Sequence, residues 1–248
     1  MADSVAKIRN RVVNAIADYD MLEDGDKILV AVSGGIDSTV LLSLLIEIQR
    51  RAPFQFNLQP VLVHHGFPGS ETSHFAEWIK QQGFNLTILD CETYQMAKRN
   101  LKEGKSPCQI CSRLRRGVLY TYAVNNGISK IALGHNRDDF NETLLLNMFY
   151  SGKLAGMPPI YRASNNQIKV IRPMCHLAKD QIGEYANHLN APLIENQFCR
   201  DIPNNSRYLI RDLLNGLKKE NPAISTNILA AQSNIMPSLL MDRRFWDL

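Results

Sequence analysis

A run near the start of the chain, from Ser33 to Ser38, combines glycines, hydroxyl groups and a carboxylate in the order Ser-Gly-Gly-Ile-Asp-Ser. It lies between an apolar, β-branched segment, 27–32, and a leucine-rich segment, 39–46, which predict a buried strand and a buried helix. Glycines at such a turn let the backbone approach an anion, and the helix start offers N–H groups and a positive dipole. Asp37 could hold a metal ion. The run therefore predicts a phosphate site, with an ordinary turn capped by Asp37 or Ser38 as the alternative.

A second chemical feature is a pair of cysteines, Cys108 and Cys111, at the start of a predicted helix. The positive end of a helix lowers the pKa of a thiol, which favours metal binding or redox chemistry. A zinc ribbon needs a second pair, whereas Cys91, Cys175 and Cys199 are isolated. The pair with one distant cysteine suits an iron–sulfur cluster that has three protein ligands and one open iron. Cys91 and Cys175 lie among apolar residues and are predicted to be small core side chains.

Three arginines, Arg113, Arg115 and Arg116, follow the cysteine pair on the same predicted helix. Leu114 and Val118 have the spacing of core residues, which leaves the guanidinium groups on other faces. Guanidinium groups beside a reactive centre suit contact with RNA phosphates. A solvated helix face explains the same pattern equally well, so both interpretations stay open.

The elements that must position these residues alternate along the chain. The expected strands cover residues 27–32, 61–63, 86–89, 130–133 and 168–171, and the expected helices about residues 1–20, 39–46, 75–82, 112–125, 139–150, 178–189 and 208–217. Residues 151–166 read as an exposed loop. This alternation predicts an α/β fold with a doubly wound, mostly parallel sheet covered by helices on both faces. Sites in such sheets lie beyond the carboxyl ends of the strands, where Ser33, His64 and Gly134 all fall.

Composition limits the class of protein. The chain has 248 residues, 45% of them hydrophobic, which is enough for one large domain or a domain with an appendage. We expect an α/β domain over residues 1–175 and a mainly helical extension over residues 176–248, packed on the first. The sequence shows neither a membrane-spanning run nor a secretory signal, and the odd number of cysteines, 5, favours a reducing compartment, the cytoplasm. A net charge of +4 permits a nucleic-acid partner without requiring one.

The run Ser33–Ser38 resembles the Ser-Gly-Gly-x-Asp-Ser signature of the PP-loop ATP pyrophosphatases, which split ATP between the α and β phosphates. It is neither a Walker A motif nor a dinucleotide fingerprint. Longer stretches are similar to one branch of that superfamily, the tRNA 2-thiocytidine synthetases (TtcA). These stretches are Pro107–Tyr120, Ile131–Thr143, Leu146–Leu154, Ile171–Pro173 and Asn234–Ser238.

The resemblance implies an ATP- and iron–sulfur-dependent tRNA sulfurtransferase. It would adenylate the C2 oxygen of an anticodon-loop cytidine and replace that oxygen with sulfur from a cysteine desulfurase, using Mg²⁺. A [4Fe-4S] cluster would be held by Cys108, Cys111 and Cys199, with Asp37, Cys108 and Cys111 in catalytic roles and Arg113, Arg115 and Arg116 on tRNA. The implied ATP-binding residues are Ala31, Val32, Ser33, Gly34, Gly35, Asp37, Ser38, His64, Gly134, His135 and Asp139.

Some alternatives stay open. The family usually has lysine at the position of Ile36, whereas lysidine synthetases have an apolar residue there. The competing functions are therefore lysidine formation, thiolation of another base, and binding of RNA or nucleotide without catalysis. A homodimer is also possible. The motif Asp139-x-x-Glu142-Thr143 either orients nucleotide or metal or forms a capping box with Asp139 as the N-cap. His135 is either a pocket residue or an ordinary hydrogen-bonded histidine.

Overall fold

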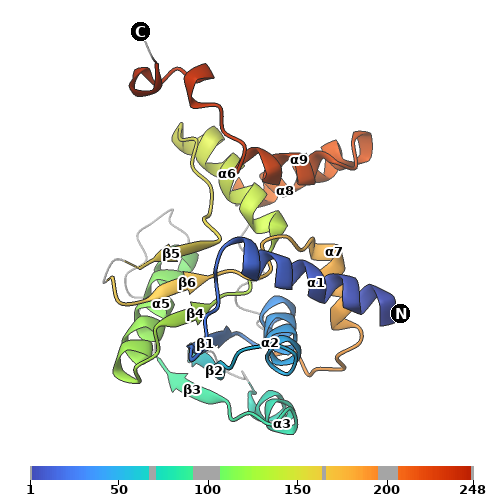
Figure 1. Ribbon diagram of the computed structural model, residues 1–248, viewed down its shortest axis with the longest axis vertical. Coiled ribbons are helices and arrows are strands. Elements are labelled where there is room, and N and C mark those ends of the chain that lie inside the picture. The colour runs from blue at the N-terminus through green and yellow to red at the C-terminus, as the bar shows by residue number, and fades with distance from the viewer. Residues whose placement is uncertain (1, 67–70, 92–106, 164–165, 195–205, 247–248) are drawn as a thin grey trace. The chain divides into compact units, whose positions relative to one another are not determined.

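The computed structural model describes residues 2–66, 71–91, 107–163, 166–194 and 206–246 (Figure 1). The chain divides into two compact units. Unit 1 comprises Met1–Asn136 and Pro158–Pro203, and unit 2 comprises Arg137–Met157 and Asn204–Leu248. These units do not coincide with the division predicted at residue 175, because unit 2 takes a segment from the middle of the chain and unit 1 extends beyond residue 175.

Unit 1 is built around a sheet that has six strands within the described residues, in the order β3-β2-β1-β4-β6-β5. The strands are β1 (Lys27–Val32), β2 (Asn57–His64), β3 (Thr87–Asp90), β4 (Lys130–Ala132), β5 (Ile160–Arg162) and β6 (Lys169–Ile171). All pairs are parallel except β5 with β6. The predicted α/β fold with a mostly parallel sheet is confirmed.

The strand order places a topological switch point next to β1. The chain leaves β1 through helix α2 (Ile36–Gln49) to β2 on one side, while β4 pairs with β1 on the other side. The loops that follow β1 and β4 therefore diverge at the carboxyl ends of neighbouring strands. Open α/β sheets bind their ligands in the crevice that such loops form.

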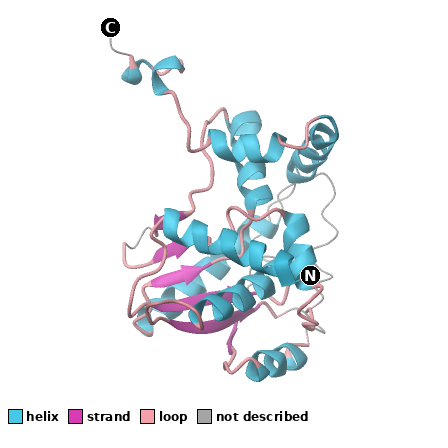
Figure 2. Cartoon of the chain, turned by 45° about the vertical axis from the view of Figure 1, so that its right-hand side comes forward, coloured by secondary structure: helices cyan, strands magenta, loops and turns pink. Residues whose placement is uncertain are grey.

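Helices cover both faces of this sheet (Figure 2). Helices α1 (Ala2–Asp18), α2 and α7 (Lys179–Ala186) contact one another, and α2 packs on β1 and β2. Helix α5 (Pro107–Asn125) contributes Leu119 and Ala123 to a core cluster that includes Leu29 of β1. Successive residues of a strand point to opposite faces, so Ile28 and Val30 face the α2 side while Leu29 faces α5. Helix α3 (Ser73–Gln81) lies between β2 and β3 in the sequence.

The sequence-based element boundaries need two corrections. β5 lies inside the segment expected to be an exposed loop, because its hydrogen bonds come from β6 rather than from a local pattern. Helices α2 and α5 also begin earlier than expected, at Ile36 and Pro107.

Unit 2 is helical in its described residues. It contains α6 (Arg137–Ser151), α8 (Ser206–Glu220) and α9 (Ile224–Ala231), which contact one another, and two short 3₁₀ turns, Pro237–Leu239 and Arg243–Phe245. Phe140 and Leu144 of α6 and Ile210 and Leu214 of α8 are buried. In neither unit do the described residues include a helix with the length and apolarity that a membrane crossing demands.

Candidate active site

The turn between β1 and α2, which we call the phosphate loop (Ser33–Ser38), has the backbone geometry expected of an anion site. Gly34 has a φ of +75°, in the left-handed region that favours glycine. Gly35 is the N-cap of α2, and its side-chain-free position leaves the first N–H groups of the helix unobstructed. Asp37 lies in the first turn rather than at the cap. Neither Asp37 nor Ser38 is therefore the N-cap of α2, and phosphate binding by the loop stays a prediction.

Hydroxyl groups hold the phosphate loop in shape. The Ser38 hydroxyl donates to the Gly35 carbonyl at 3.0 Å and accepts from the Ser33 N–H at 3.0 Å. The Thr39 hydroxyl donates to the same carbonyl at 3.0 Å. Ser38 is buried, whereas Ser33 is exposed and its hydroxyl lies 3.1 Å from that of Ser38. Ser38 thus shapes the loop, whereas a ligand contact of the exposed Ser33 hydroxyl stays a prediction.

The loop after β4 meets the phosphate loop directly. A Cβ atom on Gly134 would lie 3.1 Å from the carbonyl carbon of Asp37 and 3.2 Å from the nitrogen of Ser38. Any larger residue at this position would force the two loops apart. The sequence placed Ser33 and Gly134 at the same sheet edge, and the structure brings their loops into contact at the switch point.

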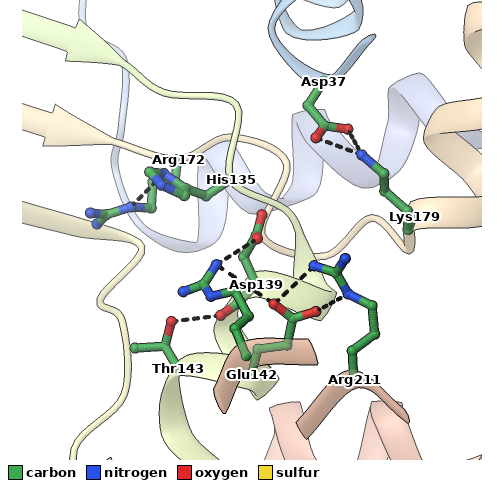
Figure 3. Close-up of polar contacts among 9 residues, drawn as sticks. Asp37, His135, Asp139, Glu142, Thr143, Arg172, Lys179 and Arg211 are labelled. Atoms are coloured by element: carbon green, nitrogen blue, oxygen red, sulfur yellow. Dashed lines mark hydrogen bonds and ion pairs between the residues drawn. The ribbon is translucent and has the colours of Figure 1, made fainter. Parts of the chain in front are cut away.

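His135, the next residue, is held by a buried arginine from the loop after β6. The Nε–H of Arg172 donates to Nδ1 of His135 at 3.2 Å (Figure 3), and Nη1 donates to the Pro158 carbonyl at 2.5 Å. The Arg172 guanidinium also lies 4.9 Å from the centre of the Tyr161 ring. Burial lowers the pKa of Arg172, which remains a cation in proteins. Because Nδ1 accepts a hydrogen bond, the proton of a neutral His135 resides on Nε2.

A lysine that the sequence analysis missed contacts the phosphate loop. Nζ of Lys179, the first residue of α7, lies 2.5 Å from Oδ1 and 2.6 Å from Oδ2 of Asp37 (Figure 3). The two residues are 142 positions apart in the sequence, so no local pattern could pair them. Both side chains are partly accessible to solvent.

The segment after α7 also reaches the phosphate loop. The N–H of Ile194 donates to the Gly34 carbonyl at 3.0 Å. A Cβ atom on Gly34 would lie 2.5 Å from the Ile194 side chain, which is a second reason why this position requires glycine. Cys199 follows in the sequence but lies outside the described residues.

The carboxyl end of β2 brings helix α5 to the same sheet edge. His64 ends β2, and its Nδ1 lies 3.2 Å from Oδ1 of Asp90, the paired residue at the end of β3. Burial lowers the pKa of the neighbouring His65 to about 4, with smaller contributions from the charges of Arg115 and His64. Arg115 belongs to α5 and follows Cys111 by about one helical turn. Helix α5 therefore packs on β2, and the charge of Arg115 acts on His65 just beyond the carboxyl end of that strand.

The cysteines differ in their environments. Cys111 is partly buried in α5, and Cys108 occupies a position one turn earlier in the same helix, so the two positions share a face. Cys175 is 1% exposed, and burial raises the pKa of its thiol to about 12. Cys91 is partly buried against the core cluster under α5, and burial raises its pKa as well. The prediction of a core side chain is confirmed for Cys175, whereas Cys91 is only partly buried against the core cluster.

The predicted cluster is not assembled within the described part of the chain. The described His, Cys, Asp and Glu side chains form no group of three that could hold a metal ion. Two of the three predicted ligands, the Cys108 side chain and Cys199, fall outside those side chains. The described member of the set, Cys111, supplies a thiol, which is the ligand that iron–sulfur clusters take.

Arg113, Arg115 and Arg116 are exposed on α5, as expected both of an RNA contact and of a solvated face. The Nε–H of Arg116 donates to the Ser112 carbonyl at 3.3 Å, along its own helix. Their role in tRNA binding stays a prediction.

In unit 2, the acidic residues of α6 pair with basic residues of α8. The Glu142 side chain is 2% exposed, and its two oxygens accept from Nε and Nη2 of Arg211 at 2.8 and 3.3 Å (Figure 3). Asp139 lies in the first turn of α6, two residues after the helix begins, so the capping-box alternative is wrong. The Thr143 hydroxyl donates to the Asp139 carbonyl at 2.7 Å. Glu142 therefore fastens α8 to α6, and a nucleotide contact of Asp139 stays a prediction.

A parallel sheet with a glycine-rich anion loop at its switch point defines an α/β nucleotide-binding protein, and comparison with known proteins specifies the class. Residues 4–217 match the family model described as a PP-loop domain, and the chain belongs to this family. Its fold is similar to that of the U34-tRNA thiolase NcsA from Methanococcus maripaludis, solved with its [4Fe-4S] cluster. That likeness has a TM-score of 0.74 at 22% identity and covers 94% of this chain and 80% of the other.

Within the PP-loop proteins, the chain belongs to the tRNA-cytidine(32) 2-sulfurtransferase family, as the sequence motifs predicted. It is 42% identical over 241 residues to the enzyme of that name from Bdellovibrio bacteriovorus, covering 97% of this chain and 93% of the relative. The enzyme of the same name from Aliivibrio fischeri is 41% identical over 241 residues, covering 97% of this chain and 78% of the relative.

Proposed function

We propose that this protein is an ATP- and iron–sulfur-dependent tRNA sulfurtransferase that converts cytidine 32 of tRNA to 2-thiocytidine. The proposal is supported by the backbone geometry of the phosphate loop after β1 and by the Cys108–Cys111 pair at the start of α5, a helix that packs on the neighbouring strand β2, in a chain of the tRNA-cytidine(32) 2-sulfurtransferase family. Activation of an oxygen by ATP and its replacement by sulfur need these two features side by side.

ATP is a substrate of this reaction, and the phosphate loop is proposed to bind its phosphates. The O2 oxygen of the cytidine attacks the α-phosphate, and pyrophosphate leaves. The N–H groups at the start of α2 and the Ser33 hydroxyl stabilise the negative charge that develops on the phosphates. Asp37 is proposed to bind Mg²⁺, which would neutralise more of that charge. Sulfur then replaces the activated oxygen at C2, and AMP departs.

His135 is proposed to contribute a hydrogen bond to the nucleotide. Arg172 occupies Nδ1, so the Nε2–H of the neutral ring is the group that can donate to a phosphate or ribose oxygen. Ala31, Val32, His64 and Gly134 belong to the same sheet edge and complete the proposed ATP-binding set in unit 1.

A [4Fe-4S] cluster fits the donor chemistry of the chain. Cys108 and Cys111 share a face at the start of α5, and Cys199 lies a few residues beyond Ile194, which is bonded to the phosphate loop. A cluster on three cysteines would supply an open iron that can carry the sulfur for transfer. The chain itself contributes the thiolate ligands and the neighbouring activation site.

The partners follow from this chemistry. Arg113, Arg115 and Arg116 are proposed to contact tRNA phosphates, and an unpaired loop base can be turned out of its stack into the site. A cysteine desulfurase is the proposed source of sulfur, and the cytoplasm, where tRNA is modified, is the proposed location. A homodimer is compatible with the proposal, which does not depend on it.

The proposal is tested with anaerobically reconstituted protein, unmodified tRNA, ATP, Mg²⁺, cysteine, lysine and a cysteine desulfurase. Nucleosides from the digested tRNA are identified by mass spectrometry, and AMP is measured in parallel. We expect 2-thiocytidine and AMP to form together, and Cys111→Ser to abolish the 2-thiocytidine and the cluster absorbance. The matched control, Cys175→Ser, should retain both. AMP formation with a lysidine product, or a protein that binds zinc alone after anaerobic reconstitution, would overturn the proposal.

A further inference from the structure

Lys179 reaches the phosphate loop from a distant part of unit 1. Its ammonium group spans both carboxylate oxygens of Asp37, at 2.5 and 2.6 Å. The Lys179 side chain is 53% exposed and that of Asp37 is 33% exposed, so a ligand in the loop can reach both groups. Residues 33–38 include no basic side chain, and Lys179 therefore brings a cation to a loop whose own sequence lacks one.

The position of Lys179 in its helix is electrostatically unfavourable. It is the first residue of α7, where the positive end of the helix dipole disfavours a cation. Helix capping does not explain why a lysine occupies this position, because another residue caps the helix. The Gln181 side chain accepts a hydrogen bond from the N–H of Ala178, the N-cap of α7, at 3.1 Å. A residue that breaks a local rule without a local benefit is expected at a functional site.

Packing fixes the backbone of α7 while the lysine side chain stays accessible. Ile182 and Tyr185 of α7 are 0% and 1% exposed, and the Tyr185 hydroxyl donates to Oε1 of Glu47 on α2 at 2.7 Å. A cavity of about 120 Å³ with a mixed lining lies between the two elements. It is lined by Ile36, Thr39 and Val40 of α2 and, on the other side, by residues that include Asn187, Leu189 and Leu193. The Lys179 ammonium is thus delivered to a fixed place beside Asp37.

We propose that Lys179 binds the pyrophosphate part of the nucleotide. Before the nucleotide arrives, Asp37 holds the ammonium group beside the loop and keeps the carboxylate neutralised. Rotation of the flexible lysine side chain then moves the ammonium to the β- and γ-phosphate oxygens, which releases the Asp37 carboxylate. Because pyrophosphate is the leaving group of the proposed reaction, this inference rests on the proposed function and assigns a further residue to it.

Binding of inorganic pyrophosphate tests the assignment without requiring turnover. Isothermal titration calorimetry is run on the reconstituted full chain, and adenosine binding is followed by NMR as a readout of the nucleoside subsite. Lys179→Met should weaken pyrophosphate binding about 10- to 100-fold, the loss expected for a hydrogen bond to a charged group. Adenosine affinity should change less than about twofold, and Lys179→Arg should retain part of the pyrophosphate affinity. The matched control is Lys7→Met, which removes a lysine from an exposed pair with Asp3 on α1.

A simple counter-ion role for Lys179 makes a different prediction in a double-mutant cycle with Asp37→Asn. If Lys179 only screens the carboxylate, then Asp37→Asn/Lys179→Met binds pyrophosphate as well as Asp37→Asn does, and the inference is overturned. If Lys179 contacts the phosphates, the loss persists without the carboxylate. Unchanged binding in a folded Lys179→Met protein would overturn this inference alone. A wild-type protein that binds neither ATP nor pyrophosphate would overturn the phosphate-loop assignment of the proposed function as well.

Discussion

The ion pair between Glu142 and Arg211 should respond asymmetrically to the removal of its two partners. The Glu142 side chain is 2% exposed, whereas that of Arg211 is 48% exposed. Arg211→Met leaves a carboxylate buried, and breaking a buried pair in this way costs about 3–5 kcal/mol. Nη1 of Arg207 stays 3.6 Å from the carboxylate, so we expect a value near the lower limit, about 3 kcal/mol. Glu142→Gln leaves cations that water can reach, and should cost about 1–1.5 kcal/mol.

Urea unfolding followed by circular dichroism measures the decrease in the free energy of unfolding of each variant. Hydrogen exchange of the α8 amides shows whether the decrease is localised to unit 2. The exchange data are needed because a chain of two units need not unfold in one transition. A difference of about 1.5–2 kcal/mol corresponds to roughly 3–8 °C in Tm for a chain of this size. Lys219→Met, which removes an exposed cation from the same helix, is the control and should cost less than about 0.5 kcal/mol. A loss in Glu142→Gln equal to or greater than that in Arg211→Met would refute the assignment of Glu142 as a buried anchor.

Three further predictions follow from the site. Gly34→Ala should reduce ATP affinity by at least about tenfold in calorimetry, because the added Cβ would lie 2.5 Å from another side chain at a φ of +75°; unchanged affinity in a folded protein would contradict the loop geometry. Neutralising Arg113, Arg115 and Arg116 together should lower the log–log salt dependence of tRNA binding by about 0.9 per lost phosphate contact, and an unchanged slope would make them a solvated face. Cys175, whose thiol has a pKa of about 12, should escape alkylation by N-ethylmaleimide at pH 8 until the protein is unfolded, as followed by peptide mass spectrometry; its rapid labelling in the folded state would refute its burial.

The local part of the site could be predicted from the sequence because its signals are local. Each segment favours its own local conformation. The β-branched run 27–32 favours a strand, the glycines of the phosphate loop favour a turn, and the leucine-rich start of α2 favours a helix. Because parallel strands end at one edge of a sheet, the sequence also predicted that Ser33, His64 and Gly134 lie at the same edge.

The tertiary structure decided what depends on partners distant in sequence. β5 is a three-residue strand that exists because β6 supplies its hydrogen bonds, so no periodicity marks it. The motif around Glu142 is compatible with a helix cap or a ligand site. Burial against α8 determined that Glu142 anchors a helix, while a nucleotide contact of Asp139 stays a prediction.

The sequence by itself determined the class of chemistry of this protein, and the fold determined which residues stand beside the phosphate loop. Loop composition and cysteine spacing are carried by neighbouring residues, and they predicted phosphate and cluster chemistry. The approach of Lys179 to Asp37 and of Ile194 to Gly34 depends on how α7 and the segment after it pack near α2. Apolar packing brings together the faces of helices and strands that are distant in the sequence. A local sequence pattern therefore does not show which of these elements will meet.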